Sequence, residues 1–353
     1  HTRDRRQRQM CIRDRFIGSN FINYLYEKFE EAYIVNLDSL TYASNKENLY
    51  GIPKSFHCHI NGDISDKKLL RELFKKFNFN FVINFAAESH VDRSIDDPSK
   101  FIKTNILGTY TLLDESLRFM KNNDKNLFKF IHISTDEVYG SVGKNEYFNE
   151  GTAYNPSSPY SSSKASSDHL VNAWNKTYDL PTIITNCSNN YGPYQFPEKL
   201  IPLMIINCLG EKELPVYGTG VNIRDWLFVR DHCSAIFTVM FKGNIGETYN
   251  IGGNNEIKNI DIVNIICEKL DKKIPRKNNI SYKELIKFVK DRPGHDFRYA
   301  INANKIKNKL GWEPNESFET GIEQTINWYL DNQEWWKKIQ NNTYNQKRLG
   351  VLK

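Results

Sequence analysis

A regular alternation of short apolar runs and longer amphipathic stretches in the first half of this chain constrains its fold more than any other feature. The apolar runs predict five strands, at residues 33–37, 55–60, 81–85, 128–133 and 181–187. Between them, helical spacing of apolar side chains predicts helices, for example at residues 66–77 and 161–174. Such alternation is typical of an α/β protein with a doubly wound parallel sheet.

The densest group of chemically active side chains surrounds the strand expected at residues 128–133. Thr135, Asp136 and Glu137 follow that strand, at the end where open parallel sheets bind ligands. Tyr160 and Lys164 are four residues apart in the next expected helix and so share one of its faces. A neighbouring ammonium favours the phenolate form of tyrosine. The sequence therefore predicts a tyrosine base for a hydroxyl group, with Lys164 as its electrostatic partner.

Taken alone, a tyrosine and a lysine at this spacing are more often a solvated helix face than a site. The adjacent carboxyls of Asp136 and Glu137, in the same strand–helix unit, favour the catalytic interpretation. They would supply an acid and a base for a second step, which is more than a simple dehydrogenase needs.

The N-terminal part carries half of a dinucleotide-binding motif. Phe16, Ile17 and Gly18 open an amphipathic helix, and the strand at residues 33–37 ends in Asp38, twenty residues after Gly18. An acidic residue at about this distance binds the adenosine ribose in Rossmann-type units. Arg15 stands where a small residue is expected, so the first strand and the glycine turn for the pyrophosphate are missing or replaced.

Residues 1–15 differ in composition from the rest of the chain. They hold six Arg, two Asp and no Lys, and so contribute +4 of the formal net charge of +6. A basic arm for nucleic acid is one interpretation. We favour another, that this segment is not native to the protein. Either it leaves a gap in the sheet, or residues 10–15 are forced into the strand position despite their arginines.

From about residue 191 the alternation is lost, and prolines divide the chain into shorter pieces. We expect strands at residues 224–229 and 248–251 and helices at 260–270, 302–310 and 318–330. Arg224 and Arg292 are two of only nine arginines after residue 15, and arginine suits the bidentate recognition of a diphosphate. The sequence thus predicts an NAD-binding domain at 16–190, a smaller α/β substrate lobe at 191–335 with some return to the main sheet, and a tail at 336–353.

Several classes of protein are excluded. No apolar run approaches the roughly 20 residues of a membrane span. The six cysteines show no paired spacing, so we expect reduced core residues in a cytoplasmic protein and neither disulfides nor a metal site. No nucleic acid or membrane partner is expected.

From Phe16 to about Leu330 the sequence resembles the extended short-chain dehydrogenase/reductases, and among them the dTDP-glucose 4,6-dehydratases. The most specific segments are residues 86–93, 134–140, 160–164, 186–202 and 291–300. The resemblance implies a lyase that dehydrates dTDP-glucose with a tightly held NAD, in dTDP-rhamnose biosynthesis, as a homodimer.

The resemblance also implies the role of each catalytic residue. Tyr160, aided by Thr135 and Lys164, would deprotonate the 4-hydroxyl of the sugar. Glu137 would remove the proton from carbon 5, which the 4-ketone acidifies. Asp136 would protonate the departing 6-hydroxyl, which requires two carboxyls with pKa values pushed apart.

By the same resemblance, two sets of residues would contact ligands. The NAD set is Phe16, Ile17, Gly18, Asp38, Ser39, Leu40, Thr41, Asp63, Ile64, Phe85, Ala86, Ala87, Glu88, Ser89, Thr104, Tyr160, Lys164 and Asn190. The nucleotide-sugar set is Ser89, Thr135, Asn189, Glu198, Lys199, Leu200, Ile201, Pro202, Leu203, Met204, Ile205, Pro215, Val216, Tyr217, Arg224, Asn259, Asp291, Arg292, Pro293, Gly294 and His295.

Three alternatives remain open. A UDP-sugar 4-epimerase shares the tyrosine and lysine but has no use for the two carboxyls. A GDP-mannose 4,6-dehydratase or UDP-glucuronate decarboxylase keeps the glutamate but usually replaces the aspartate. A non-catalytic NAD-binding relative would need neither carboxyl. The presence of Asp136, Glu137 and Tyr160 together favours the dehydratase.

Overall fold

The computed structural model describes residues 8–12, 16–29, 31–123 and 128–342. Its centre is a seven-stranded sheet in which every pairing is parallel, in the order β10-β6-β5-β4-β1-β2-β3. The strands are β1 (Arg8–Ile12), β2 (Ala32–Asp38), β3 (His57–Asn61), β4 (Phe81–Asn84), β5 (Lys129–Thr135), β6 (Thr182–Cys187) and β10 (Thr248–Ile251). The predicted Rossmann-type doubly wound sheet is therefore confirmed.

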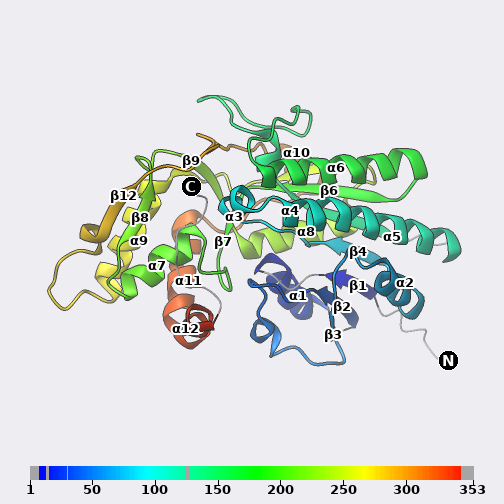
Figure 1. The fold of residues 1–353 in the computed structure, drawn as a ribbon, viewed down its shortest axis with the longest axis horizontal. Helices are drawn as coiled ribbons and strands as arrows, with labels where there is room; N and C mark the ends of the chain where they lie inside the picture. The colour runs from blue at the N-terminus through cyan, green and yellow to red at the C-terminus, as the bar shows by residue number, and fades with distance from the viewer. Residues whose placement is uncertain (1–7, 13–15, 30, 124–127, 343–353) are drawn as a thin grey trace.

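Helices cover both faces of this sheet (Figure 1). On one face, α1 (Phe16–Lys28) and α8 (Val229–Lys242) pack on Ile34, Ile83 and Ile131. On the other, α2 (Lys67–Lys76), α5 (Thr109–Asn123) and α6 (Pro159–Tyr178) pack on Val35, Val82 and Phe130. Residues adjacent in a strand thus join opposite cores, as the pleat of a sheet buried on both faces requires.

The segment after residue 97 is not one continuous α-helix. Between α3 (Val91–Asp96) and α5 the chain forms α4 (Ser99–Phe101) and a π-helical segment, η2 (Ile102–Gly108). Asn105 lies in η2, where its Oδ1 accepts from the Glu88 N–H at 2.8 Å and its Nδ2 donates to the Glu88 carbonyl and to Ser163. This buried amide therefore ties the loop after β4 to α6.

The first strand position of the sheet is filled. The backbone of β1 lies between β2 and β4, with Met10 paired to Ile34 on one side and to Phe81 on the other. Of the two arrangements that the sequence left open, the structure has a strand in this position, at Arg8–Ile12. Arg15 and the expected pyrophosphate turn lie outside the described residues, as do residues 1–7 and 343–353.

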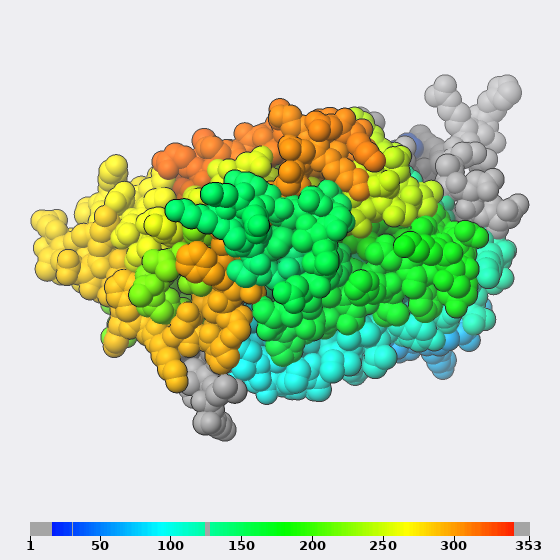
Figure 2. Space-filling view, turned by 90° about the horizontal axis from the view of Figure 1, so that it is seen from above, coloured from blue at the N-terminus to red at the C-terminus, as the bar shows by residue number. Residues whose placement is uncertain are grey.

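The second half of the chain builds a lobe at one end of the sheet, drawn at the left of Figure 1 and in yellow and orange in Figure 2. It holds a three-stranded sheet, β11-β9-β7, and a parallel pair, β12-β8. Its core joins α7, α9 and α11 through residues such as Ile205, Ile266 and Ile322. The strands are β7 (Asn189–Tyr191), β8 (Leu214–Tyr217), β9 (Ile223–Phe228), β11 (Glu256–Lys258) and β12 (Ile286–Val289).

Three helices of this half agree with the predicted ones to within a few residues: α9 (Asn259–Lys273), α10 (Asn304–Leu310) and α11 (Phe318–Asp331). The helices α7 (Leu200–Leu209) and α12 (Gln333–Asn342) were not predicted. The segment expected to be a tail from residue 336 begins inside α12, where Trp336 and Ile339 are buried. Short 3-10 turns complete the chain at η1 (Lys46–Leu49), η3 (Asp136–Tyr139) and η4 (Tyr282–Leu285). No helix within the described ranges has the length and apolar character needed to span a bilayer.

Candidate active site

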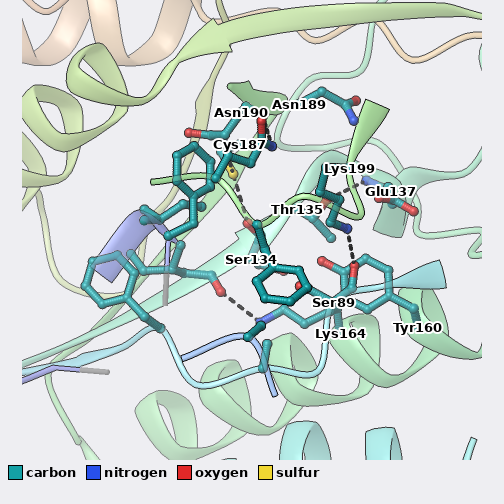
Figure 3. A pocket seen from close by; sticks show the side chains of 18 of the residues that line it. Ser89, Ser134, Thr135, Glu137, Tyr160, Lys164, Cys187, Asn189, Asn190 and Lys199 are labelled. Atoms are coloured by element: carbon teal, nitrogen blue, oxygen red, sulfur yellow. Dashed lines mark hydrogen bonds between the residues drawn. The ribbon is translucent and has the colours of Figure 1, made fainter. Parts of the chain in front are cut away.

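A cleft of about 1140 Å³ opens at the carboxyl ends of the central strands, and we call it the cofactor-side cleft. The strand order reverses between β1 and β4, which is where open α/β sheets bind ligands. The walls of the cofactor-side cleft come from the first turn of α1, the loop after β4, the ends of β5 and β6, and the start of α6. Figure 3 shows Thr135, Glu137, Tyr160 and Lys164 around this space, with Cys187 and Asn190 on another wall.

The start of α6 fixes the position of Tyr160. Ser158 caps the helix: its Oγ accepts from the Ser161 N–H at 3.1 Å, and the Ser161 hydroxyl accepts from the Ser158 N–H in return. Pro159, whose fixed φ suits a first helical turn, follows the cap. Tyr160 is consequently held in the first turn, with its ring edge against Phe101. Burial and the nearby Glu137 raise the pKa of Tyr160, while a hydrogen bond with Thr135 lowers it.

Lys164 lies one turn further along α6, and its side chain is almost fully buried. Its Nζ donates to the Ile133 carbonyl at 2.8 Å and lies 3.4 Å from Nε2 of His132. The ammonium is therefore fixed against β5, below the first turn of α6. Burial lowers the pKa of Lys164, and Asp168 opposes that shift.

Asp136 and Glu137 sit where β5 ends and η3 begins, because Thr135 caps that turn through its Oγ1, which accepts from the Glu137 N–H at 3.3 Å. Asp136 is 1% exposed, and its Oδ1 accepts from the Thr135 hydroxyl at 3.3 Å. Its Oδ2 is buried without a hydrogen-bond partner, as a neutral carboxyl tolerates better than a charged one. Burial raises the pKa of Asp136 well above its usual value, with a further contribution from Glu137.

Glu137 has different neighbours. Burial raises its pKa too, but Arg292, Lys199 and Arg224 all lower it. The two adjacent carboxyls are thus in unlike environments: Asp136 is buried beside the carboxyls of Glu137 and Asp225 with Arg224 as its one opposing cation, and Glu137 faces three cations. This arrangement favours a protonated Asp136 beside an ionised Glu137, the combination that one acid and one base require.

A second cleft, of about 1260 Å³, adjoins the first, and we call it the substrate-side cleft. Glu137, Asn189, Glu198 and Lys199 line both clefts. The walls of the second combine apolar side chains of α7 and α9 with cations from β9 and the loop before α10. Glu137 is consequently at the junction of the two spaces.

Arg224 of β9 forms no salt bridge with a carboxylate of the described residues. Its guanidinium donates to the backbone carbonyls of Ile223, Asp296 and Phe297 at 2.8, 2.8 and 3.3 Å and stacks on the ring of Tyr299, 4.2 Å from the centroid. Since these direct contacts are all to uncharged groups, Arg224 can attract a phosphate at the cleft wall.

Arg292 is held by the first half of the chain. Its Nη1 donates to Oδ1 of Asp92 in α3 at 2.9 Å, and the hydroxyl of Tyr217 donates to Oδ2 of the same carboxylate at 3.0 Å. Nε of Arg292 is buried without a hydrogen-bond partner. Asp92 therefore positions both a cation and an aromatic ring of the substrate-side cleft, across 200 residues of sequence in the case of Arg292.

The predicted NAD residues divide into two groups. Nine of them line the cofactor-side cleft: Phe16, Ile17, Gly18, Phe85, Ala87, Ser89, Tyr160, Lys164 and Asn190. Nine others do not: Asp38, Ser39, Leu40, Thr41, Asp63, Ile64, Ala86, Glu88 and Thr104. Asp38 nevertheless ends β2 as predicted, with Oδ1 accepting from the Leu40 N–H at 2.6 Å and the Ser44 hydroxyl at 2.8 Å.

Most predicted sugar-nucleotide residues line the substrate-side cleft: Asn189, Glu198, Lys199, Leu200, Leu203, Met204, Pro215, Val216, Tyr217, Arg224, Asn259, Arg292 and His295. Ser89 and Thr135 line the other cleft. Ile201, Pro202 and Ile205 are buried on α7. Asp291, Pro293 and Gly294 lie in an exposed loop outside the cleft wall.

Glu198 has contacts that the sequence did not suggest. It accepts from the hydroxyl of Tyr42 at 2.8 Å and from Nε of Arg93 at 3.1 Å, and Arg93 stacks on the ring of Tyr42, 3.8 Å from the centroid. This triad joins the loop after β2, helix α3 and the start of α7, so Glu198 connects the walls of the two clefts.

Sequence reasoning missed several wall residues: Tyr42, Ala43, Ile133, Ser134, Cys187, Ser188, Gln195 and Phe196 of the first cleft, and His90, Val91, Asp92, Trp226 and Val263 of the second. Ser134, Cys187 and Ser188 lie at strand ends, and that position was a usable signal. The sequence gives no sign that Trp226 and Val263 line a cleft. An apolar residue of a strand or a helix has the same sequence pattern whether it lies in a core or in a cleft wall.

Known proteins are similar to this chain over most of its length. The model of the GDP-mannose 4,6 dehydratase family matches residues 15–325. A dTDP-glucose 4,6-dehydratase of Escherichia coli is 51% identical over 352 residues, covering 96% of this chain and 97% of the relative.

Two solved structures are similar in fold and sequence. The dTDP-glucose 4,6-dehydratase of Bacillus anthracis in complex with NAD has a TM-score of 0.83 and 46% identity, covering 94% of this chain and 99% of the other. The dTDP-glucose 4,6-dehydratase from Streptomyces venezuelae, also with NAD bound, has a TM-score of 0.85 and 40% identity over the same shares. The chain therefore belongs to the family of nucleotide-sugar 4,6-dehydratases, and the resemblance to its dTDP-glucose members is confirmed.

Proposed function

We propose that this chain dehydrates dTDP-glucose to dTDP-4-keto-6-deoxyglucose. The observation that carries the proposal is the unlike pair of carboxyls at the end of β5, with Asp136 buried and Glu137 facing Arg224, Arg292 and Lys199. An epimerase needs no such pair, because it neither abstracts the proton at carbon 5 nor expels a hydroxyl. The dTDP-glucose relatives at 51% identity support the nucleotide and the sugar.

NAD fits the cofactor-side cleft. The first turn of α1 lines this cleft through Phe16, Ile17 and Gly18, and the free N–H groups of a helix N-terminus suit a pyrophosphate. Asp38, at the end of β2, is the residue for the ribose. NAD supplies the acceptor for the hydride from carbon 4 and the donor of that hydride to carbon 6.

The side chains of the junction carry the proton transfers. Tyr160 takes the proton of the 4-hydroxyl, assisted by the hydroxyl of Thr135 and by the charge of Lys164. Glu137 takes the proton at carbon 5, and Asp136 gives its proton to the departing 6-hydroxyl, which leaves as water. Arg224 and Arg292 hold the diphosphate in the substrate-side cleft. Residues 16–190 thus bind NAD and supply the groups that transfer protons, and residues 191–335 supply most of the binding site for the nucleotide-sugar.

We also propose a cytoplasmic homodimer that acts in dTDP-rhamnose biosynthesis. Exposed apolar residues on the outer layer support the dimer: Leu107 is 52% exposed, Tyr110 41% and Tyr178 43%. Tyr110 packs on Trp174, which packs on Tyr178, so α5 and α6 present them together. Light scattering with size separation measures the mass. A Leu107→Glu variant should be monomeric, and a monomeric parent would refute the dimer.

The function is tested by incubating the protein with NAD and, separately, with dTDP-glucose, UDP-glucose and GDP-mannose. Mass spectrometry should show the loss of one water from dTDP-glucose alone. A version in which residues 1–15 are replaced by an apolar strand and a glycine turn controls for weak cofactor binding. Epimerised UDP-glucose, detected by chromatography because the epimers have equal mass, with no water lost from dTDP-glucose by either version, would overturn the proposal.

A further inference from the structure

A group of buried polar residues lies behind the cleft wall, beyond the residues assigned to proton transfer. It consists of His132 on β5, Asp168 on α6, and the hydroxyl groups of Ser134 and Tyr154 that bond to Asp168. His132 and Asp168 are both 0% exposed. Burying an aspartate at this depth is unfavourable unless a positive charge or several donors compensate it. Packing alone therefore does not account for a buried carboxyl at this position.

The tautomer of His132 follows from its neighbours. The Ala86 N–H donates to Oδ1 of Asn84, so the amide nitrogen of Asn84 is the atom that faces Nδ1 of His132, at 3.2 Å. Nδ1 is thus the acceptor. Burial lowers the pKa of His132 to about 4, so the ring is neutral and carries its hydrogen on Nε2.

Nε2 of His132 is the meeting point of the group. It lies 3.1 Å from Oγ of Ser167, 3.3 Å from Oδ1 of Asp168 and 3.4 Å from Nζ of Lys164. Ser167 donates its own hydrogen to the Lys164 carbonyl, so its oxygen is able to accept from Nε2–H. The carboxylate of Asp168 and the ammonium of Lys164 therefore both lie within 3.4 Å of the same ring nitrogen.

Asp168 accepts two hydrogen bonds through its second carboxyl oxygen. Its Oδ2 accepts from the hydroxyl of Ser134 at 2.8 Å and from that of Tyr154 at 3.0 Å. A buried carboxyl oxygen needs such donors. Since α6 repeats about every four residues, Tyr160, Lys164 and Asp168 follow one another along a single helix face.

The other titratable groups that face Lys164 carry no compensating charge. His132 from β5 is neutral, burial raises the pKa of Cys187 on β6 to about 12, and burial raises the pKa of Tyr160. Asp136 in η3 is in an environment that favours its protonated form. Among the groups that shift the pKa of Lys164, Asp168 is the one that counters burial most strongly.

We propose that Asp168 is a positioning residue of the reaction: it is the buried counter-charge of Lys164 beside His132, and it keeps that lysine protonated while Tyr160 acts as the base. Without this negative charge, the buried ammonium, which donates to the neutral Ile133 carbonyl, would release its proton more readily. A neutral lysine would no longer favour the phenolate of Tyr160. The role of Lys164 in the proposed function therefore depends on a carboxylate that never touches the substrate.

A double-mutant cycle on stability tests the pairing without any need for turnover. Asp168→Asn, Lys164→Met and the double variant are unfolded with urea and compared with the parent. Asp168→Asn should lower the unfolding midpoint in the parent. It should leave unchanged or raise the midpoint in the Lys164→Met background, where Asp168 is a buried charge without its partner. Equal effects in both backgrounds would overturn the proposal.

Folding failure is also informative. If Asp168→Asn alone does not fold, a folded double variant supports the pairing, and a double variant that is equally unfolded contradicts it. Tyr154→Phe is the matched control, since it removes one hydrogen bond from Asp168 and keeps the charge. Its effect should have the same sign with Lys164 and with Met at that position.

A kinetic measurement tests the consequence and rests on the proposed function. The rate of NAD reduction in a single turnover is followed against pH, with dTDP-glucose in excess. In Asp168→Asn, the loss of activity on the alkaline side should move to lower pH by about one unit or more, because the lysine loses its proton earlier. Tyr154→Phe should leave the profile in place. An unmoved profile in Asp168→Asn would overturn the role, and an inactive parent would instead refute the proposed function.

Discussion

The two clefts that meet at Glu137 differ in their cations. The cofactor-side cleft is walled mainly by short side chains, amides and rings, with Lys164 and Lys199 as its cations, and its acid, Asp136, is buried beside Glu137. The substrate-side cleft shares Lys199 and adds Arg224 and Arg292. One carboxyl therefore keeps its proton while its neighbour in sequence is driven to release one. The difference shows how two identical functional groups acquire opposite roles from their surroundings alone.

The largest effect is expected at the base that serves the cofactor-side cleft. Tyr160→Phe should slow the overall turnover by about 10²–10⁴-fold, because the 4-hydroxyl loses its proton acceptor. Affinity for the nucleotide-sugar should hardly change, since the arginines of the other cleft are untouched. Steady-state kinetics with a separate binding titration checks this. Normal turnover with a much weaker affinity would show that the division between the clefts is wrong.

Glu137→Gln should separate the two halves of the reaction. The amide cannot take the proton at carbon 5, so product formation should fall by a comparable factor of about 10²–10⁴. Bound NAD should still become reduced, because Tyr160 keeps its role. Absorbance of the reduced cofactor in a single turnover, beside product analysis by mass, distinguishes the steps. Unchanged product formation would contradict the role of Glu137.

The unlike carboxyls predict a bell-shaped dependence of the elimination step on pH. Acidification protonates Glu137, whose pKa burial raises, and removes the base. Alkalinisation deprotonates Asp136, whose pKa lies well above the usual aspartate value, and removes the acid. Asp136→Asn should lose most of the activity, and the remaining rate should no longer fall at alkaline pH. If the rate of this variant still fell at alkaline pH, the titrating group would be one other than Asp136.

Removal of a cation from the substrate-side cleft should act on binding. Arg224→Ala should weaken the affinity for dTDP-glucose by about 10- to 100-fold, the value of one or two charge-assisted hydrogen bonds to a phosphate. Arg230→Ala removes a surface arginine paired with Glu27 and serves as the control. Calorimetric titration measures both. Equal affinities in the two variants would exclude Arg224 from the diphosphate site.

The smallest effect concerns the edge of the cofactor-side cleft. When residues 1–15 are replaced by an apolar strand that ends in a glycine-rich turn, NAD should bind roughly tenfold more tightly, because backbone N–H groups then reach the pyrophosphate. Affinity for dTDP nucleotides alone should stay the same. Calorimetry compares the two versions, and equally tight NAD binding by both would refute a damaged motif.

Much of the fold was predictable because its signals are local. The apolar runs that predicted strands at residues 33–37 and 248–251 correspond to β2 and β10, and the expected helix at 318–330 to α11. A buried parallel strand appears in the sequence as a short apolar run, and an amphipathic helix as apolar residues spaced three to four positions apart, so both are visible in neighbouring residues. The positions of Thr135 and Asp136 at a strand end, and of Tyr160 at a helix start, followed from the same patterns.

The first strand shows the opposite case. The sequence around Arg8–Ile12 opposes a buried strand, yet the backbone there takes that position between β2 and β4. The remaining strands leave one place open in the ladder, and unpaired backbone groups at the centre of a sheet are costly. Here the pairing requirement of the whole sheet prevails over the preference of five residues.

The sequence by itself determined that this chain folds as a doubly wound α/β protein with Asp136, Glu137, Tyr160 and Lys164 at one edge of its sheet. Only the tertiary structure decided which carboxyl keeps its proton, because Arg224 and Arg292 come from segments far along the chain. It also decided that Asp92 orients Arg292 and that Asp168 faces Lys164 across His132. Charge, burial and hydrogen bonding depend on which side chains are close in space. The periodicity of neighbouring residues does not predict which distant side chains will meet in one desolvated site.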